Sequence, residues 1–268
     1  MTQTTARKPR TVIITGGATG IGYAIAEQML GQGDRVVLNG RTQSKLAEAA
    51  QRLAQPAHIA TVVGDITQPA TAASIIGAAV DHFGGVDVLV NNAGIFEAKP
   101  FTDYTVDELD AYLGYLRGTF VMTQAAVRRM RQQGRGGAVI NIGTILAGNA
   151  VAGIPSSAPV AAKGGITALT KNLSSELAAD RIRINAVAPG IVPTPLYGQL
   201  TDEDRTALHA MQPLGRYGTP RDIADAVRYL ADAEWVTGVI LAVDGGVDAG
   251  GDGASRVNTA EHEQTAAA

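Results

Sequence analysis

The chain has 268 residues, of which 46% are hydrophobic and 18% are charged, and it contains no cysteine. Its 22 Lys and Arg residues stand against 25 Asp and Glu residues, which gives a formal net charge of −3. The lack of cysteine excludes a disulfide scaffold, an iron–sulfur cluster and a thiolate zinc site. The weakly acidic balance argues against nucleic acid as a partner, because phosphate binding rests on clustered Lys and Arg.

The two ends of the chain differ in character from the rest. Met1–Arg10 is polar and has no apolar signal core, and no uncharged apolar run approaches the roughly 18 residues of a membrane span. We therefore expect a cytoplasmic protein without membrane contact. Residues 1–10 are expected to be flexible, and residues 248–268, which lack apolar periodicity, to be disordered. Residues 11–247 are then expected to form a single domain.

Between these ends, short apolar runs alternate with longer helical patterns. The runs are nearly continuous, as in parallel strands that are covered on both faces. This alternation predicts an α/β fold, with helices on both faces of a doubly wound parallel sheet. The predicted strands are Thr11–Thr15, Arg35–Asn39, His58–Val63, Val86–Asn91, Ala138–Ile142, Arg183–Val187 and Val239–Val243. The predicted helices are Gly20–Leu30, Ser44–Leu53, Ala70–Asp81, Val106–Met130, Ala161–Ala179 and Pro220–Ala231.

A glycine-rich segment, Thr15–Gly22, joins the first predicted strand to the first predicted helix. Ligands of such sheets bind beyond the carboxyl ends of the strands, where glycines let the backbone approach a pyrophosphate. The helix that follows offers free N–H groups and the positive end of its dipole. We therefore predict a dinucleotide phosphate site, with an ordinary glycine-rich turn as the alternative. Its residues are Gly16, Thr19, Gly20, Ile21 and Gly22.

The end of the second predicted strand bears on the type of dinucleotide. An Asp or Glu about 20 residues after the glycine loop would accept hydrogen bonds from the adenosine ribose of NAD. The segment Leu38–Arg41 has no such acid. Arg41 could instead hold the 2′-phosphate of NADP through charge-assisted hydrogen bonds. The sequence thus favours NADPH, with a solvated Arg41 as the alternative.

Further motifs follow the strands in order, and with them the chain resembles the short-chain dehydrogenase/reductase family. Thr15–Gly22 resembles its TGxxxGxG loop, Asn91–Gly94 its NNAG segment, and Pro189–Thr194 the segment that holds the nicotinamide. The resemblance runs from Thr11 to about Val247 and implies a Rossmann fold with a sheet of about seven strands. It also implies a homo-oligomer, a tetramer or a dimer, packed through the two long helices. The cofactor-binding residues that it adds are Asp65, Ile66, Asn91, Ala93, Gly94, Lys163, Pro189, Gly190, Val192 and Thr194.

The catalytic residues of that family are matched only in part. The resemblance implies a Tyr four residues before Lys163, but Pro159 stands there. Thr144 falls at the position of the family's Ser, and Tyr115 at that of its Asn. Lys163 is retained and is implied to bind the nicotinamide ribose. We expect Thr144 to stabilise an oxyanion and Tyr115 to be the first candidate for a substitute acid, with a Tyr115 packed in a helix interface as the alternative.

These departures leave two hypotheses open. In the first, the protein is an atypical NADPH-dependent reductase that transfers hydride to an activated carbonyl or conjugated enone of a small molecule. The anion formed from such a substrate is delocalised and needs no strong acid nearby. A short segment around Pro155–Ser157 resembles the dienoyl-CoA reductase branch and supports conjugate reduction. In the second, the protein binds the dinucleotide without turnover, as a sensor or pseudoenzyme partner. No metal site is expected, because the 4 histidines are scattered.

Overall fold

The computed structural model describes residues 7–151, 153–194 and 201–249, which fold around one sheet. The order of its 7 strands is β3-β2-β1-β4-β5-β6-β7, and every pairing is parallel. This confirms the predicted doubly wound fold. The strands are β1 Thr11–Thr15, β2 Arg35–Gly40, β3 Ile59–Val63, β4 Val88–Asn91, β5 Gly137–Ile142, β6 Ile182–Pro189 and β7 Ile240–Val243. The helices are α1 Gly20–Gly31, α2 Gln43–Leu53, α3 Pro69–Phe83, α4 Val106–Gln133, α5 Ser157–Glu176, α6 Asp202–Ala210 and α7 Pro220–Asp232.

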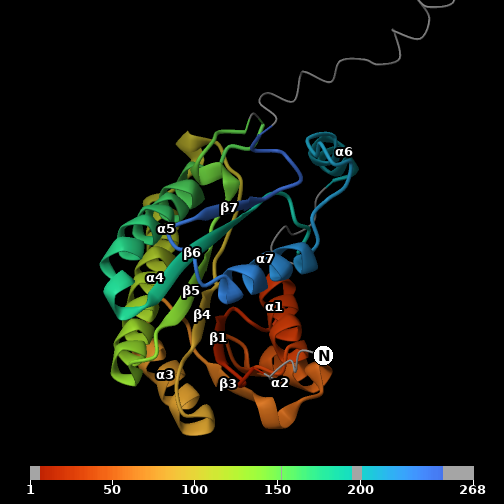
Figure 1. The fold of residues 1–268 in the computed structure, drawn as a ribbon. Helices are drawn as coiled ribbons and strands as arrows, with labels where there is room; N and C mark the ends of the chain where they lie inside the picture. The colour runs from red at the N-terminus through yellow and green to blue at the C-terminus, as the bar shows by residue number, and fades with distance from the viewer. Residues whose placement is uncertain (1–6, 152, 195–200, 250–268) are drawn as a thin grey trace, which may run out of the picture.

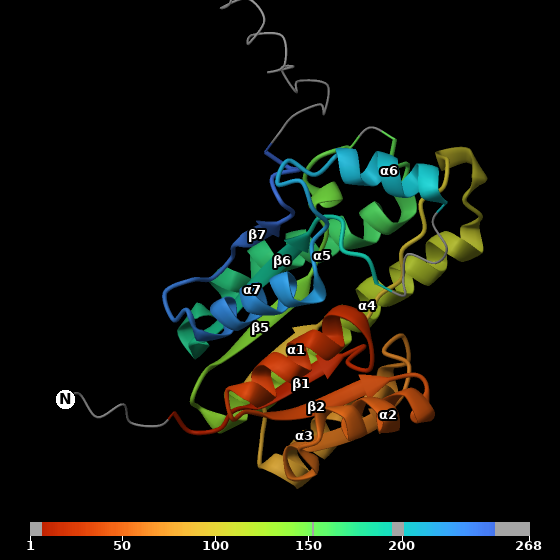
Figure 2. The same cartoon turned by 90° about the vertical axis from the view of Figure 1, so that its right-hand side faces the viewer.

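Helices cover both faces of the sheet. Figure 1 shows α3, α4 and α5 on one face, and α1, α2 and α7 on the other. In Figure 2 α1 and α7 lie side by side in front of the strands. The central strand β1 serves both layers, because Val12 and Ile14 belong to the core under α1 and α7, whereas Ile13 belongs to the core under α3 and α4. All three are fully buried, which explains why the strand is a continuous apolar run.

Helix α5 differs from its prediction at both ends. It begins at Ser157 rather than Ala161, and it ends at Glu176 rather than Ala179. Pro159 is therefore the third residue of the helix instead of preceding it. The first helical hydrogen bond runs from the N–H of Val160 to the carbonyl of Ser156, at 2.9 Å. A proline is tolerated at this place because N–H groups of the first turn have no helical acceptor.

The amino-terminal boundary also lies earlier than predicted. The carboxylate of Asp34 is fully buried and accepts the backbone N–H of Arg10 at 2.9 Å. The guanidinium groups of Arg7 and Arg10 pair with it, each at 2.9 Å. Residues 7–10 are thus held against the domain, whereas the other predicted flexible residues, 1–6, lie outside the described ones. The same is true of residues 250–268 of the predicted disordered tail.

Helix α6 was not predicted at all. It is a short, polar segment after β6, and this composition is also typical of a loop. Within the described ranges, no helix has the length and apolar character that crossing a membrane requires.

Candidate active site

The glycine-rich loop lies at the centre of the sheet, where β1 pairs with β2 on one side and with β4 on the other. The hydroxyl of Thr15 accepts the backbone N–H groups of Asn92 and Ala93, at 3.0 and 3.1 Å. The side chain of Asn92 donates in return to the carbonyls of Thr15 and Gly16, at 3.0 and 3.1 Å. These bonds fasten the loop to the end of β4. Asn92 was not among the predicted site residues, although the NNAG segment contains it.

The loop has the shape and donors that a pyrophosphate requires. Gly16 has a φ of +65°, in the left-handed region. A Cβ at Gly22 would lie 2.3 Å from the carbonyl oxygen of Gly16, so only glycine fits there. The side chain of Thr19 does not cap α1, and the first helical bond is that of the Tyr23 N–H. The N–H groups of the first turn are therefore left for a ligand. The predicted residues Gly16, Thr19, Gly20, Ile21 and Gly22 all lie in this loop and turn.

Arg41, Asp65 and Ile66 follow the next two strands at the same edge of the sheet. Arg41 is exposed directly after β2, and Asp65 is half-buried after β3. Ile66 is buried, and its carbonyl oxygen lies against α4 at Gly118, where a Cβ would approach it to 2.6 Å. Helix α4 thus closes over the loop after β3. The three residues lie where the adenosine end of a dinucleotide is expected in a sheet of this type.

Tyr115 of α4 belongs to this end of the site. Burial raises the pKa of its phenol, the positive charge of Arg41 lowers it, and the negative charge of Asp65 raises it. The pKa of Lys163 is shifted by burial alone, with no contribution from a tyrosine among the described residues. The charges that act on Tyr115 are therefore those of the adenosine end. This placement argues against the prediction that Tyr115 supplies the missing acid beside Lys163.

Asn91 is placed in the core rather than in the cleft. Its side chain is buried, and its Nδ2 donates to the hydroxyl of Thr123 at 2.9 Å and to Oδ1 of Asn141 at 2.8 Å. Asn141 donates in turn to the hydroxyl of Thr170, also at 2.8 Å. This buried chain joins β4 and β5 to α4 and α5. The side chain of Asn91 therefore faces the core, whereas that of Asn92 reaches the loop. That Asn91 binds the cofactor stays a prediction.

Lys163 and Thr144 lie at the ends of β4 and β5. Nζ of Lys163 donates to the carbonyl of Ile142 at 2.6 Å, and a Cβ at Gly94 would lie 3.4 Å from Nζ. Burial lowers the pKa of Lys163 to about 8. The hydroxyl oxygen of Thr144 accepts the N–H of Leu146 at 3.3 Å, so its proton can be donated to a ligand. The two side chains present donors at one edge of the sheet.

The segment after β6 is fixed at the same edge. The N–H of Gly190 donates to the carbonyl of Val243 at 3.1 Å, and a Cβ there would lie 2.7 Å from Cα of Asp244. Glycine is thus needed for this segment to lie against the end of β7. Val192 is buried beneath it. The predicted residues Pro189, Gly190, Val192 and Thr194 come together here, next to residues 195–200, which lie outside the described ones.

The loops after β4 and β5 are joined to each other by contacts that the sequence did not reveal. The backbone N–H of Lys99 donates to the carbonyl of Pro155 at 2.8 Å. The phenol of Tyr104 donates to the carbonyl of Glu97 at 2.6 Å, and the ammonium of Lys99 pairs with Glu108. The bond of Lys99 to Pro155 therefore ties the loop after β4 to the segment that precedes α5. One of these contacts joins two backbone groups, and the others involve single side chains that form no recognisable motif.

A glycine cradle at the switch point of a parallel sheet, with a lysine and a hydroxyl at the neighbouring strand ends, defines a dinucleotide-dependent enzyme. Comparison with known proteins identifies the family within this class of enzymes. A family model described as Enoyl-(Acyl carrier protein) reductase matches residues 16–248. The chain belongs to the short-chain dehydrogenase/reductase family, and it is an NAD(P)-dependent oxidoreductase.

Relatives with several activities share most of this chain. A 3alpha-hydroxysteroid dehydrogenase of Mediterraneibacter gnavus is 37% identical over 245 residues, which cover 89% of this chain and 96% of that protein. A 3-oxoacyl-(acyl-carrier-protein) reductase of Vibrio cholerae is 35% identical over 241 residues, with 89% and 97% covered. The crystal structure of a short-chain type dehydrogenase/reductase from Mycobacterium marinum is 30% identical, with a TM-score of 0.84, and covers 89% of this chain and 95% of that one.

Proposed function

We propose that the protein is an NADPH-dependent reductase of small molecules that acts on an activated carbonyl or a conjugated enone. The observation that carries this proposal is a complete dinucleotide cradle beside a proline, Pro159, one helical turn before Lys163. The reduced nicotinamide supplies hydride when it is bound. The fold and cradle favour a redox cofactor, whereas Pro159 leaves no phenol to protonate the alkoxide that a simple ketone would form.

The reason lies in the charge that develops on the substrate oxygen. Hydride addition to a simple ketone leaves a localised, strongly basic alkoxide, which requires a nearby acid. Conjugate addition leaves a delocalised enolate, which hydrogen bonds can stabilise. Pro159 is buried in α5 and has no ionisable proton. Thr144 and Lys163 remain as donors to the substrate oxygen. The description of the matching family model, an enoyl reductase, supports a conjugated substrate.

Turnover with a panel of acceptors tests this function. With NADPH, the purified protein is expected to reduce at least one class of enone, dienoyl thioester or quinone. Simple aliphatic ketones are expected to react at least about 100-fold more slowly, because they lack the delocalised anion. Loss of NADPH absorbance, with product identified by mass spectrometry, measures this. Tight NADPH binding without turnover of any acceptor would contradict the proposal and favour a protein that only binds the dinucleotide.

NADP preference is proposed from Arg41, which is exposed directly after β2 where no carboxylate stands. Arg41→Ala is expected to weaken NADPH binding by about 10- to 100-fold, because charge-assisted hydrogen bonds to the 2′-phosphate are lost. NADH binding should change by less than about threefold. Fluorescence titration with both cofactors measures the two dissociation constants. Arg131→Ala, which removes an exposed arginine paired with Asp180, is the control for general charge. Equal effects of Arg41→Ala on both cofactors would reject the assignment.

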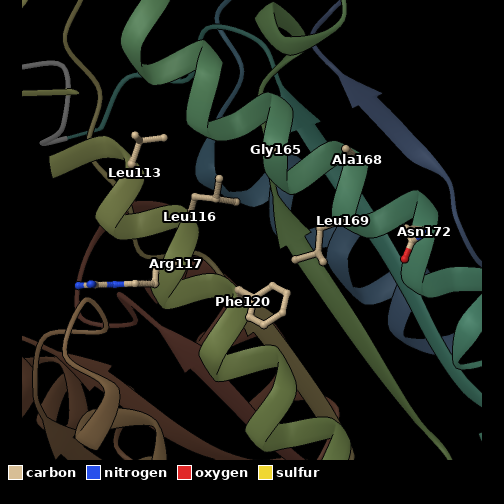
Figure 3. Close-up of a pocket in the computed structure, with 8 residues that line it drawn as sticks. All are labelled: Leu113, Leu116, Arg117, Phe120, Gly165, Ala168, Leu169 and Asn172. Carbon is tan, nitrogen blue, oxygen red and sulfur yellow. The ribbon is translucent and has the colours of Figure 1, made fainter. Parts of the chain in front are cut away.

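We also propose that two copies of the chain associate through α4 and α5. A groove of about 560 Å³ lies between these helices on the outside of the molecule. Figure 3 shows Phe120 and Leu169 pointing into it, whereas Arg117 points away from α5. Phe120 is 50% exposed and Leu113 is 39% exposed, so apolar surface faces outward along α4. Light scattering that gives only the mass of one chain, 27.6 kDa, would reject this proposal.

A further inference from the structure

Pro159 and Lys163 lie on the same face of α5. Ala158 and Ala162 pack against Tyr112 in a small apolar cluster on the α4 side of the helix. Pro159 and Lys163 each follow one position later, so both are rotated by the same angle away from that cluster. Residues four apart lie one above the other on a helix. The side chain at position 159 is therefore the neighbour of Lys163 along the helix, and it carries no ionisable proton.

Lys163 is held at a defined place by uncharged groups. Nζ donates one hydrogen bond, at 2.6 Å, to the carbonyl of Ile142 at the end of β5. Gly94, after β4, lies close to Lys163 on the other side. A Cβ at Gly94 would be only 3.4 Å from Nζ, so the absence of a side chain there leaves room around the ammonium. An ammonium has three N–H donors, so two remain for other partners. Thr144 follows Ile142 by two residues and directs a second donor group to the same edge.

Among the described residues, Lys163 donates to the carbonyl of Ile142 and makes no ion pair. In the described part of the chain, no carboxylate of β4, β5, α4 or α5 and no phenol contributes to its pKa. The pKa of Tyr115, the phenol on α4 that the sequence suggested as a substitute acid, is shifted by the charges of Arg41 and Asp65 instead. The ammonium of Lys163 is thus an ionisable group that lies between the ends of β4 and β5, on the same face of α5 as Pro159.

We propose that Lys163 itself is the general acid of the reaction. This proposal rests on the proposed reductase function. When the substrate oxygen gains negative charge, one N–H bond of the Lys163 ammonium breaks and an O–H bond forms on that oxygen. The electron pair of the N–H bond stays on Nζ, which becomes a neutral amine, and a proton from solvent restores the ammonium. Thr144 donates a hydrogen bond to the same oxygen.

The burial of Lys163 suits it to this role. Its pKa of about 8 makes the ammonium a stronger acid than an exposed lysine or a tyrosine of ordinary pKa, about 10, while it stays mostly protonated at neutral pH. An acid whose pKa lies near the working pH is the most effective donor. Because only the protonated form donates, the rate of reduction should be constant well below pH 8. It should fall about tenfold per pH unit above that value.

Lys163→Arg separates proton donation from a purely electrostatic role. Arginine keeps the positive charge but does not release a proton in a protein. We expect kcat to fall at least about 100-fold, the usual contribution of a general acid. The decline of rate above pH 8 should disappear. A Lys163→Arg protein that keeps more than a tenth of wild-type kcat, with the wild-type pH profile, would overturn the proposal. A similar loss in Tyr115→Phe would overturn it too, by assigning the proton to a phenol.

A second measurement uses neither cofactor nor turnover, and it holds even if the arginine variant misfolds. Trace acylation of the cofactor-free wild-type protein with acetic anhydride, followed by peptide mass spectrometry, gives the reactivity of the Lys163 amine against pH. Half-maximal reactivity is expected near pH 8, and a midpoint near that of a free lysine peptide would overturn the proposal. The failure of the general-acid proposal can be distinguished from the failure of the proposed function. A wild-type protein that reduces no acceptor rejects the reductase function itself, whereas an active protein with a lysine midpoint near that of a free peptide rejects only the role of Lys163.

Discussion

Gly22→Ala is expected to weaken NADPH binding by at least about 100-fold. The new methyl carbon would lie 2.3 Å from the carbonyl oxygen of Gly16 and 2.6 Å from Nδ2 of Asn92. These groups cannot give way without breaking the hydrogen bonds that Asn92 makes to the loop, at 3.0 and 3.1 Å. The loop that approaches the pyrophosphate must therefore move, and the first turn of α1 with it. Isothermal titration calorimetry measures the loss of affinity.

Gly31→Ala is the matched control on the same helix. Gly31 is the last residue of α1, its φ is not in the left-handed region, and a Cβ there would meet nothing within 4 Å. Alanine at this place should leave NADPH affinity unchanged and raise stability by at most about 1 kcal/mol. Circular dichroism of both variants separates loss of the site from loss of the fold. Wild-type affinity in a folded Gly22→Ala protein would show that the dinucleotide binds elsewhere.

Asp34→Ala is expected to lower the free energy of unfolding by about 3 kcal/mol. The Asp34 carboxylate is fully buried and receives the backbone N–H and the guanidinium of Arg10 as well as the guanidinium of Arg7. The side chain of Arg10 is itself only 15% exposed. Removing Asp34 therefore leaves a largely buried charge with one remaining carboxylate, that of Asp232 at 2.8 Å. Urea unfolding followed by circular dichroism measures the change.

Asp180→Ala provides the contrast for an exposed ion pair. Asp180 pairs with Arg131 at 2.7 Å, but their side chains are 31% and 47% exposed. Water screens such a pair, so its loss should cost no more than about 1 kcal/mol. The difference between the two variants then reports burial rather than charge alone. If Asp34→Ala destabilised the protein no more than Asp180→Ala does, the amino-terminal residues 7–10 would not be anchored as the structure places them.

Much of the fold could be predicted because this sheet is covered on both faces. Strand β1 has the same bounds in sequence and structure, since Val12, Ile13 and Ile14 are all buried and form an unbroken apolar run. The start of α5 could not be predicted in this way. Proline usually marks a helix boundary, but it is also compatible with the first turn, and only the hydrogen bond of Val160 to Ser156 decides between the two. Helix α6 is short and polar, so its sequence resembles that of a loop.

Sequence motifs predicted the course of the backbone in the candidate site. They predicted the directions of its side chains less well. The glycine loop follows from spacing, because no other residue type fits where a Cβ would meet a carbonyl. Asn91 and Asn92 are identical in type and adjacent, yet one lies in the core and the other holds the loop. Tyr115 likewise has a sequence position that does not reveal which charges surround it. The direction of a side chain depends on the pleat of its strand or the rotation of its helix. The sequence pattern predicts where a strand or helix begins only to within about a residue, and a shift of one residue turns the side chain to another face.

The mutual hydrogen bonds of Thr15 and Asn92 have a kinetic consequence. They fasten the loop after β1 to the end of β4 within the protein alone, at 3.0 to 3.1 Å. A recognition loop that is already ordered has little conformational entropy left to lose on association. Dinucleotide capture should then proceed in a single step, its speed governed by encounter in solution rather than by a slow rearrangement of the loop.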